Sequence, residues 1–161
     1  MVIPVVKNPN DILRVHTTDM SLDTLKTEEI QQLANNMIDT MYATQGIGIA
    51  AVQVGQDLRM CIIGKEADAS LTDDLVLVNP TWEKTSRKKK KDEEGCLSIP
   101  NVFGDVVRWT NIHVEALDRH GTPLSFDAKG FFARVIQHEV DHLNGVLFID
   151  TATNIREMRS Q

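Results

Sequence analysis

The sequence has few of the features that mark secreted, membrane-bound or nucleic-acid-binding proteins. Only two of its 161 residues are cysteine: Cys61 in an apolar strand-like run, and Cys96 in a glycine-flanked turn. A chain without a secretion signal usually keeps such thiols reduced. No apolar run approaches the length that crosses a bilayer. The formal net charge is −6, so the surface as a whole repels nucleic acid and anionic membranes.

The chain is expected to form a single domain over residues 1–161 with a short C-terminal tail. Its apolar fraction of 42% is ordinary for a globular protein, and its length suffices for one sizeable core. The first residues, MVIPVVKNPNDILR, have no basic start and are interrupted by Pro4, which is unlike a secretory signal. We therefore expect a monomer in the reducing cytoplasm, with no membrane partner.

Hydrophobic periodicity predicts two helices and several short strands. Thr27 is the candidate cap of an amphipathic helix over residues 27–43. Asp127 is the candidate cap of a second helix, which runs through Leu143 and ends at Asn144-Gly145. The predicted strands cover residues 60–64, 75–80, 112–118, 123–126 and 146–150, with a hairpin-like stretch after the second. This order predicts an α+β fold with mainly antiparallel strands around the second helix as a central helix.

The second helix contains the stretch QHEVDHLNG (137–145), which has the spacing of a metal site. His138 and His142 are four residues apart, so both imidazoles lie on one helix face and can reach the same ion. Glu139 follows the first histidine, as in the H-E-x-x-H motif of metal-dependent hydrolases. Two ligands do not complete a site, so a third is required.

Cys96 in EEGCLSIP (93–100) is the best candidate for the third ligand. Among the other histidines, His113 alternates with apolar neighbours on a predicted strand and His120 lies in a turn, so surface or core positions suit both better. Taken alone, Cys96 could be a small buried hydrophobe. Together with two imidazoles, its thiolate makes three protein ligands with one open position, the pattern of a catalytic metal centre.

Three blocks of the sequence together resemble the signature motifs of peptide deformylases. They are GIGIAAVQVG (46–55), EEGCLSIP and QHEVDHLNG, in the family's order and at similar separations, and the likeness extends over residues 3–150. The resemblance implies removal of the formyl group from the N-terminal methionine of nascent peptides, with release of formate. It also implies that Cys96, His138 and His142 bind one divalent ion, Fe²⁺ physiologically, with Zn²⁺, Ni²⁺ or Co²⁺ as possible occupants.

The resemblance assigns further catalytic roles. Glu139 is the general acid/base, which takes a proton from water and returns it to the departing amine. The side-chain NH₂ of Gln53 and the backbone N–H of Leu97 stabilise the negative charge that grows on the formyl oxygen. Gly46 and Gly48 allow the peptide substrate to lie alongside the backbone as an added strand.

Methionine requires an apolar pocket, for which Ile47, Val135 and Phe131 are candidates, although each could be a core residue. Arg134 lies one helical turn before His138 and points toward the cleft side of the helix. It either extends to solvent along the pocket rim or contacts the peptide backbone or an acidic residue of the peptide. The predicted substrate-binding residues are Ile47, Gly48, Glu94, Gly95, Arg134 and Val135.

Three further features surround these motifs. Asp141 is expected to support the metal ligands from outside, with Arg108 as its partner. Phe103 stands where a basic residue often assists substrate binding in the resembled family. The run RKKKK (87–91) is either a solvated loop or a weak contact with ribosomal RNA.

Two other functions are compatible with parts of the pattern. A small H-E-x-x-H peptidase would cut internal amide bonds, but such enzymes usually use a histidine or carboxylate where this chain has Cys96. A catalytically inactive metal-binding or ribosome-associated module would need neither Glu139 nor Gln53. Both alternatives are therefore less favoured than a deformylase.

Overall fold

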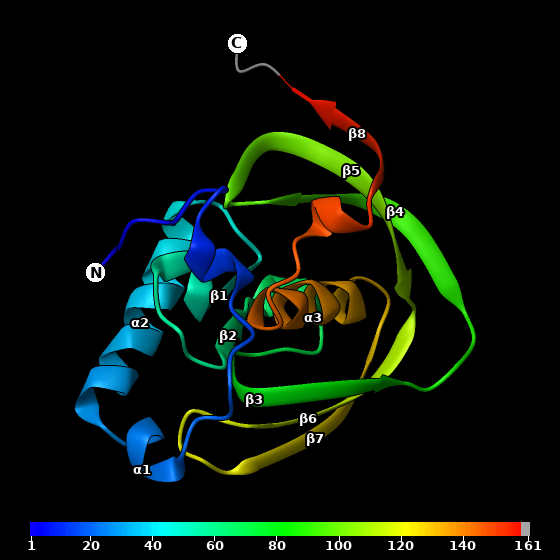
Figure 1. Ribbon diagram of the computed structural model, residues 1–161. Coiled ribbons are helices and arrows are strands. Elements are labelled where there is room, and N and C mark those ends of the chain that lie inside the picture. The colour runs from blue at the N-terminus through cyan, green and yellow to red at the C-terminus, as the bar shows by residue number, and fades with distance from the viewer. Residues whose placement is uncertain (159–161) are drawn as a thin grey trace.

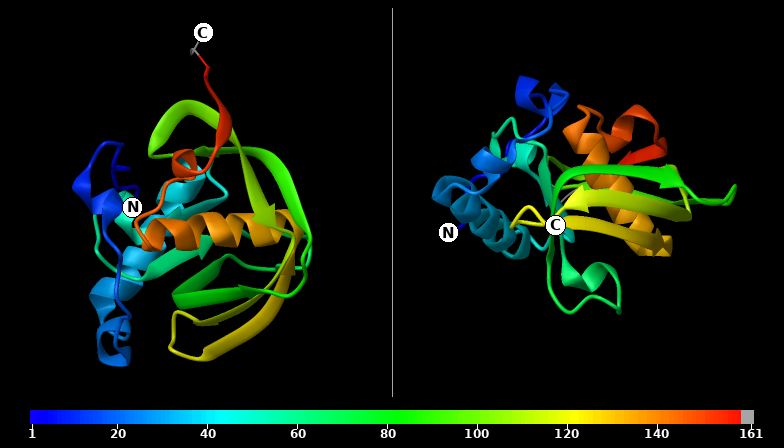
Figure 2. Two further views of the ribbon diagram at one scale, coloured as in Figure 1. Left: turned by 45° about the vertical axis from the view of Figure 1, so that its right-hand side comes forward. Right: turned by 90° about the horizontal axis from the view of Figure 1, so that it is seen from below.

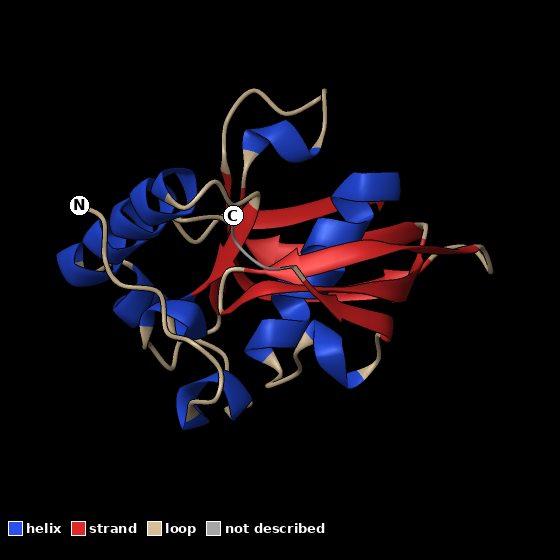
Figure 3. Cartoon of the chain, turned by 90° about the horizontal axis from the view of Figure 1, so that it is seen from above, coloured by secondary structure: helices blue, strands red, loops and turns tan. Residues whose placement is uncertain are grey.

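The fold consists of two antiparallel sheets with a long helix, α3, between them (Figures 1 and 3). The computed structural model describes residues 1–158. The larger sheet has the strand order β1-β2-β3-β6-β7, the smaller one β4-β5-β8, and every pairing is antiparallel. The strands are β1 Gly48–Ala50, β2 Met60–Ile63, β3 Leu75–Lys84, β4 Lys89–Cys96, β5 Ile99–Trp109, β6 Asn111–Leu117, β7 Pro123–Lys129 and β8 Thr153–Glu157.

Helices make up a smaller part of the chain than strands and loops. The α-helices are α1 Leu22–Leu25, α2 Glu28–Ala43 and α3 Gly130–Leu143, and the 3₁₀ turns are η1 Asp11–Arg14, η2 Ala51–Val54, η3 Lys65–Ala67 and η4 Phe148–Asp150. None of the helices described in residues 1–158 has the length and apolar character to cross a membrane. The predicted α+β class, with antiparallel strands around the helix that carries HEVDH, is confirmed.

The central position of α3 follows from its sequence. Ten of its 14 residues are buried, among them the polar Arg134, Gln137, Glu139 and His142, so the helix is covered around most of its circumference rather than along one stripe. A helix of this kind has to be covered on several sides, and α3 packs against β1, β2 and β7 of the larger sheet and β5 of the smaller one. Figure 2 shows α3 flanked by strands of both sheets.

The two faces of strands β1 and β2 are covered by different helices. Alternate residues such as Cys61 and Ile63 pack toward α3, whereas Met60 and Ile62 pack toward α2, as the two-residue period of a strand requires. The amphipathic α2 begins at the cap Thr27, whose side chain accepts from the Ile30 N–H. The predicted helix over residues 27–43 is therefore confirmed.

The predictions for the ends of the second helix and for the last strand need correction. Asp127 is not a helix cap, because β7 continues through Lys129 and the Asp127 carboxylate binds the His113 imidazole, with 2.7 Å between Oδ1 and Nδ1. Residues 146–150 do not form a strand. They contain the 3₁₀ turn η4, in which the Asp150 carboxylate accepts from the Leu147 N–H at 3.0 Å.

Strand β8 was not predicted from the sequence. It follows η4 in the tail of the chain and pairs with β5, with Val102 opposite Glu157. Its residues are mostly exposed and polar, so no alternation of apolar side chains marks it. The hairpin expected between the second and third predicted strands is the β4–β5 pair. The rest of the predicted tail, residues 159–161, lies outside the described residues.

Gly145, which ends α3, is expected to be essential for stability. Its φ is +76°, and a Cβ atom there would lie 2.5 Å from the carbonyl oxygen of Arg14. We expect Gly145→Ala to lower the free energy of unfolding by roughly 2 to 4 kcal/mol, from backbone strain and steric overlap together. Chemical denaturation with urea measures this change.

Gly130→Ala is the matched control for Gly145→Ala. Gly130 also has a positive φ, +58°, but a Cβ there would meet no atom within 4 Å. Its replacement should therefore cost only the conformational strain, about 1 kcal/mol. Equal losses for the two variants would contradict the steric explanation for Gly145.

Candidate metal centre

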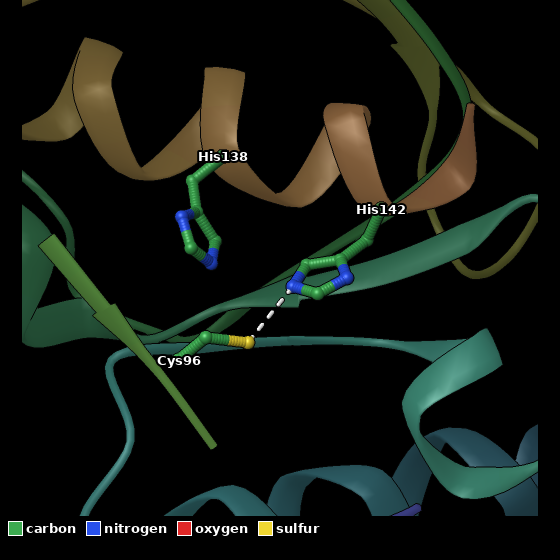
Figure 4. Close-up of side chains that lie close together, drawn as sticks. All are labelled: Cys96, His138 and His142. Atoms are coloured by element: carbon green, nitrogen blue, oxygen red, sulfur yellow. Dashed lines mark hydrogen bonds between the residues drawn. The ribbon is translucent and has the colours of Figure 1, made fainter. Parts of the chain in front are cut away.

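Three metal-binding side chains meet between α3 and the end of β4. Figure 4 shows His138 and His142 projecting from α3 toward Cys96. One ligand atom from each residue lies within 4.8 Å of the other two, and Cys96 Sγ is 3.2 Å from His142 Nε2. The spacing prediction is confirmed: residues 42 positions apart in the chain, Cys96 and His138, reach one point.

The chemistry of these donors fits a divalent transition metal. A thiolate and two imidazoles suit Zn²⁺, Fe²⁺, Co²⁺ or Ni²⁺ and leave one coordination position for a reactant. Burial, with the charge of His138 nearby, lowers the pKa of His142 well below its usual range. A neutral imidazole is the form that binds a metal, and the lowered pKa of His142 favours that form.

His138 is oriented by a carboxylate behind it. Its Nδ1 lies 2.9 Å from Oε1 of Glu94, so Nε2 is the nitrogen left for the metal site. A carboxylate in this position fixes the ring and makes the other nitrogen more basic. For His142, the buried Nδ1 has no hydrogen-bond partner within residues 1–158.

Glu94 is the centre of a buried ion-pair network. Arg108 donates to both of its carboxylate oxygens at 2.9 Å, and Arg134 donates to Oε2 at 2.6 Å. Burial raises the pKa of Glu94, but the hydrogen bonds from Arg108 and His138 outweigh it and lower that pKa well below its usual range. Glu94 therefore carries its charge at any pH near neutrality.

Arg108 connects this network to Asp141, as the sequence analysis expected. Its third guanidinium nitrogen, Nη1, donates to Asp141 Oδ2 at 2.5 Å. Within residues 1–158, the Asp141 side chain forms no hydrogen bond with His138 or His142. Its connection to His138 instead runs through Arg108 and Glu94.

The expectation that Arg134 extends to solvent is wrong. Its side chain is only 8% exposed, and its guanidinium binds Glu94 and the carbonyl oxygens of Val106 and Lys90. Glu94 and Arg134 both border the cleft, as predicted, but their charged groups bind each other. An unpaired charge cannot be buried at low cost, and this explains why the arginine turns inward to the carboxylate.

Glu139 lies in a different environment from Glu94. It is 4% exposed, and its Oε2 atom has no hydrogen-bond partner within residues 1–158. Burial raises the pKa of Glu139 to about 7. Gly48 provides the room for this side chain, since a Cβ at position 48 would lie 2.8 Å from Glu139 Oε1. A carboxyl with this pKa can both accept and donate a proton near neutral pH.

The Gln53 amide is held in one orientation beside the thiol. Its Oε1 accepts from the Ala50 N–H at 2.9 Å, so its NH₂ group faces Cys96 Sγ at 3.5 Å and Ser98 Oγ at 3.2 Å. Leu97 lies in the turn between β4 and β5, directly after Cys96. Both expected donors to a reacting oxygen therefore border the metal centre.

A cleft of about 770 Å³ opens onto these groups. Of the residues singled out from the sequence, those that line it are Gly46, Ile47, Gly48, Gln53, Glu94, Gly95, Cys96, Leu97, Phe103, Phe131, Arg134, Val135, His138 and Glu139. The lining also includes residues that the sequence analysis did not select, among them Lys7, Asn101 and Val102. Lys7 belongs to an irregular N-terminal segment, and no local pattern marks it as part of a site.

Comparison with known proteins identifies the family. The family model described as polypeptide deformylase matches residues 2–158. The chain belongs to the polypeptide deformylase family. It is 45% identical over 134 residues to the peptide deformylase of a Picosynechococcus strain, covering 83% of this chain and 72% of that protein. It is 42% identical over 129 residues to the Brucella suis enzyme, covering 80% and 74%.

Solved deformylase structures have the same fold. The actinonin-bound class I type b peptide deformylase of Acinetobacter baumannii superposes with a TM-score of 0.87 at 37% identity, covering 95% of this chain and 99% of that one. The Met-Ala-Ser-bound form gives 0.86, also at 37% identity, with 93% and 99% covered. The protein is thus a metal-dependent hydrolase that removes the N-formyl group from peptides.

The Glu94 network is expected to stabilise both the fold and the metal site. Glu94→Gln leaves the buried Arg134 guanidinium without a carboxylate and should lower the free energy of unfolding by roughly 3 kcal/mol. It should also weaken metal binding by about tenfold or more, because His138 loses its orienting charge. Urea denaturation of the metal-free protein and chelator competition measure the two effects.

Glu93→Gln is the control for this prediction. Glu93 precedes Glu94 on β4, but its side chain is 51% exposed and pairs with Arg156 at the surface. Exposed ion pairs contribute little to stability, so this variant should behave like the wild type. Equal effects of the two substitutions would exclude a special role for the buried carboxylate.

Proposed function

We propose that the protein deformylates N-formylmethionyl peptides with Fe²⁺ as the physiological ion, bound by Cys96, His138 and His142. The mixed thiolate and imidazole donor set supports a transition metal, and Zn²⁺, Ni²⁺ or Co²⁺ can occupy the same ligands. When bound, a divalent ion supplies Lewis acidity, which polarises the formyl carbonyl and makes water acidic enough to lose a proton near neutral pH.

Glu139 acts as the proton-transfer group in this proposal. It takes a proton from the attacking water and delivers it to the amine nitrogen of methionine as the C–N bond breaks, which releases formate. Its buried, partly unpartnered carboxyl and its raised pKa of about 7 support both halves of this transfer. Gly48 keeps the space beside this carboxyl open.

Gln53 and Leu97 stabilise the negative charge that develops on the formyl oxygen. The Gln53 NH₂ group already points toward the thiolate, and the Leu97 N–H belongs to the next residue after that thiolate. Two donors fixed before the reaction stabilise such a charge without reorganising. The support for these roles is that both residues line the cleft beside Cys96.

The peptide substrate lies along the outer edge of β1. This strand is at the end of the five-stranded sheet and its Gly48 lines the cleft, so an extended peptide in the cleft can pair with this edge. The methionine side chain enters among Ile47, Val135 and Phe131, of which Phe131 is 56% exposed beside the cleft. Gly48 and Gly95 line the cleft beside the peptide, and the room left by their missing Cβ atoms is taken by Glu139 and the Phe103 ring.

Glu94 and Arg134, which also border the cleft, serve the reaction by holding His138 rather than by binding peptide. We further propose that residues 1–161 act as one catalytic domain, as a monomer in the cytoplasm. The support for a single domain is the position of α3, which packs against strands of both sheets and so connects them.

Formate release from formyl-Met-Ala-Ser tests the proposed reaction. The wild type, prepared without oxygen and loaded with Fe²⁺ or Ni²⁺, should release formate rapidly. Glu139→Gln should keep its metal and lose activity by about 10²-fold or more. Chelation should abolish activity, and added Fe²⁺ should restore it. Acetyl-Met-Ala-Ser is the matched substrate control. Absence of formate release by protein with one bound ion per chain would reject the proposal.

The basic run 87–91 is proposed as a weak contact with ribosomal RNA. Its side chains are exposed on the β3–β4 connection and the start of β4, in a chain of net charge −6. Lys84 and Lys89 lie on the Trp109 ring, each 4.3 Å from its centroid, so that ring is not free to stack on a base. The surface therefore favours phosphate groups over bases.

Co-sedimentation with ribosomes at increasing salt tests this contact. The triple variant Arg87→Gln, Lys88→Gln, Lys91→Gln should bind more weakly and show a smaller dependence on salt, because fewer counterions are released. The control replaces three other exposed lysines, Lys26, Lys65 and Lys129, with glutamine. If both variants sediment like the wild type, the run is a solvated loop, and formate release remains the test of catalysis.

A further inference from the structure

The N-terminal segment Val6–Asn8 contacts both of the segments that carry the proposed oxygen-stabilising donors. The Val6 N–H donates to the Gln53 carbonyl oxygen at 2.7 Å. The Lys7 Nζ donates to the Leu97 carbonyl oxygen at 2.8 Å. The Asn8 N–H donates to the Ser98 carbonyl oxygen at 2.8 Å. Three consecutive residues thus bind the η2 turn and the β4–β5 turn at once (Figure 1 shows this segment in blue).

The relative position of these two turns determines whether their donors can act on one oxygen. Gln53 and Leu97 are 44 positions apart in the chain. Gln53 lies on η2, which follows β1 of the larger sheet, and Leu97 lies between β4 and β5 of the smaller sheet. Stabilisation requires each donor to be placed to within a few tenths of an ångström of its hydrogen-bonding distance from the oxygen on which the charge develops. The turns touch through the Gln53 NH₂ group and Ser98 Oγ, at 3.2 Å, but that amide is itself a proposed donor.

We propose that Val6–Asn8 is a clamp that fixes the position of the Gln53 and Leu97 donors relative to each other, with Lys7 as the positioning residue for Leu97. This inference rests on the proposed roles of Gln53 and Leu97. Lys7 donates to the carbonyl oxygen of Leu97, the residue whose N–H is the proposed donor, so it fixes the orientation of the turn. Lys7 itself borders the cleft.

The hydrogen bond from Lys7 to Leu97 contributes little to the stability of the fold. Lys7 is exposed, and so is its hydrogen bond to Leu97. Water can replace an exposed hydrogen-bond donor at little cost in stability. The carbonyls bound by Val6 and Asn8 are held by backbone N–H groups, which a side-chain substitution leaves unchanged. Replacement of Lys7 should therefore alter the precision of the turn and leave the fold intact.

Lys7→Met in the Fe²⁺- or Ni²⁺-loaded enzyme tests the clamp. We expect kcat for formyl-Met-Ala-Ser to fall roughly tenfold, while KM, bound metal and Tm stay at the wild-type values. Lys7→Arg keeps a cationic donor and should recover most of the loss. Lys65→Met removes an exposed lysine outside the cleft and should have no effect.

Amide hydrogen exchange provides a readout that is independent of activity. In Lys7→Met the backbone N–H groups of Val6 and Asn8, which are hydrogen-bonded to the two turns, should exchange faster than in the wild type because the segment opens more often, with α2 and α3 unchanged. Equal exchange together with wild-type kcat would overturn the clamp. A rise in KM alone would also overturn it, since Lys7 would then be a peptide contact, and so would a parallel fall of Tm and activity.

Failure of the clamp and failure of the proposed function give different results. A wild-type enzyme that holds metal but releases no formate rejects the proposed function. A wild-type enzyme that releases formate at the same rate as Lys7→Met rejects only the clamp.

Discussion

The buried carboxylate of Glu94 is the interaction on which the site depends. A charge in the interior is tolerated only when it is paired and fully hydrogen-bonded. Glu94 on β4 meets this condition through Arg108 of β5 and through Arg134 and His138 of α3. These three elements must therefore meet in one arrangement. Because Cys96 follows Glu94 by two residues, the contact that orients His138 also brings the thiolate to the histidines.

The surroundings of two glutamates within one site shift their pKa values in opposite directions. Glu94 is surrounded by cationic donors and stays charged, whereas burial with few partners raises the pKa of Glu139 to about 7. The first carboxylate is suited to permanent structural support and the second to proton transfer, a division that environment alone can produce. The helix α3 supports both, since His138 and Glu139 are adjacent on it and point to different neighbours.

Local sequence patterns predicted the features that depend on local geometry. His138 and His142 meet at one point if their segment is helical, whatever the rest of the chain does. The cap and the apolar period of the helix over residues 27–43 likewise involve only residues within a few positions of one another. The errors occurred where a distant group competed for a side chain. Asp127 has the residue type of a helix cap, but its carboxylate binds His113 on the neighbouring strand. Arg134 has the residue type of a solvent-exposed arginine, but a buried carboxylate 40 positions away binds it.

The sequence by itself determined the ligand set, the helix that carries most of it and the family to which the chain belongs, since each depends on residues that are close in the chain or on motifs that persist in it. Only the tertiary structure decided that Glu94 holds His138 and that Lys7 reaches Leu97. The contact of Glu94 with His138 spans 44 positions and that of Lys7 with Leu97 spans 90. Such contacts depend on how separate segments pack, and no local periodicity encodes that packing.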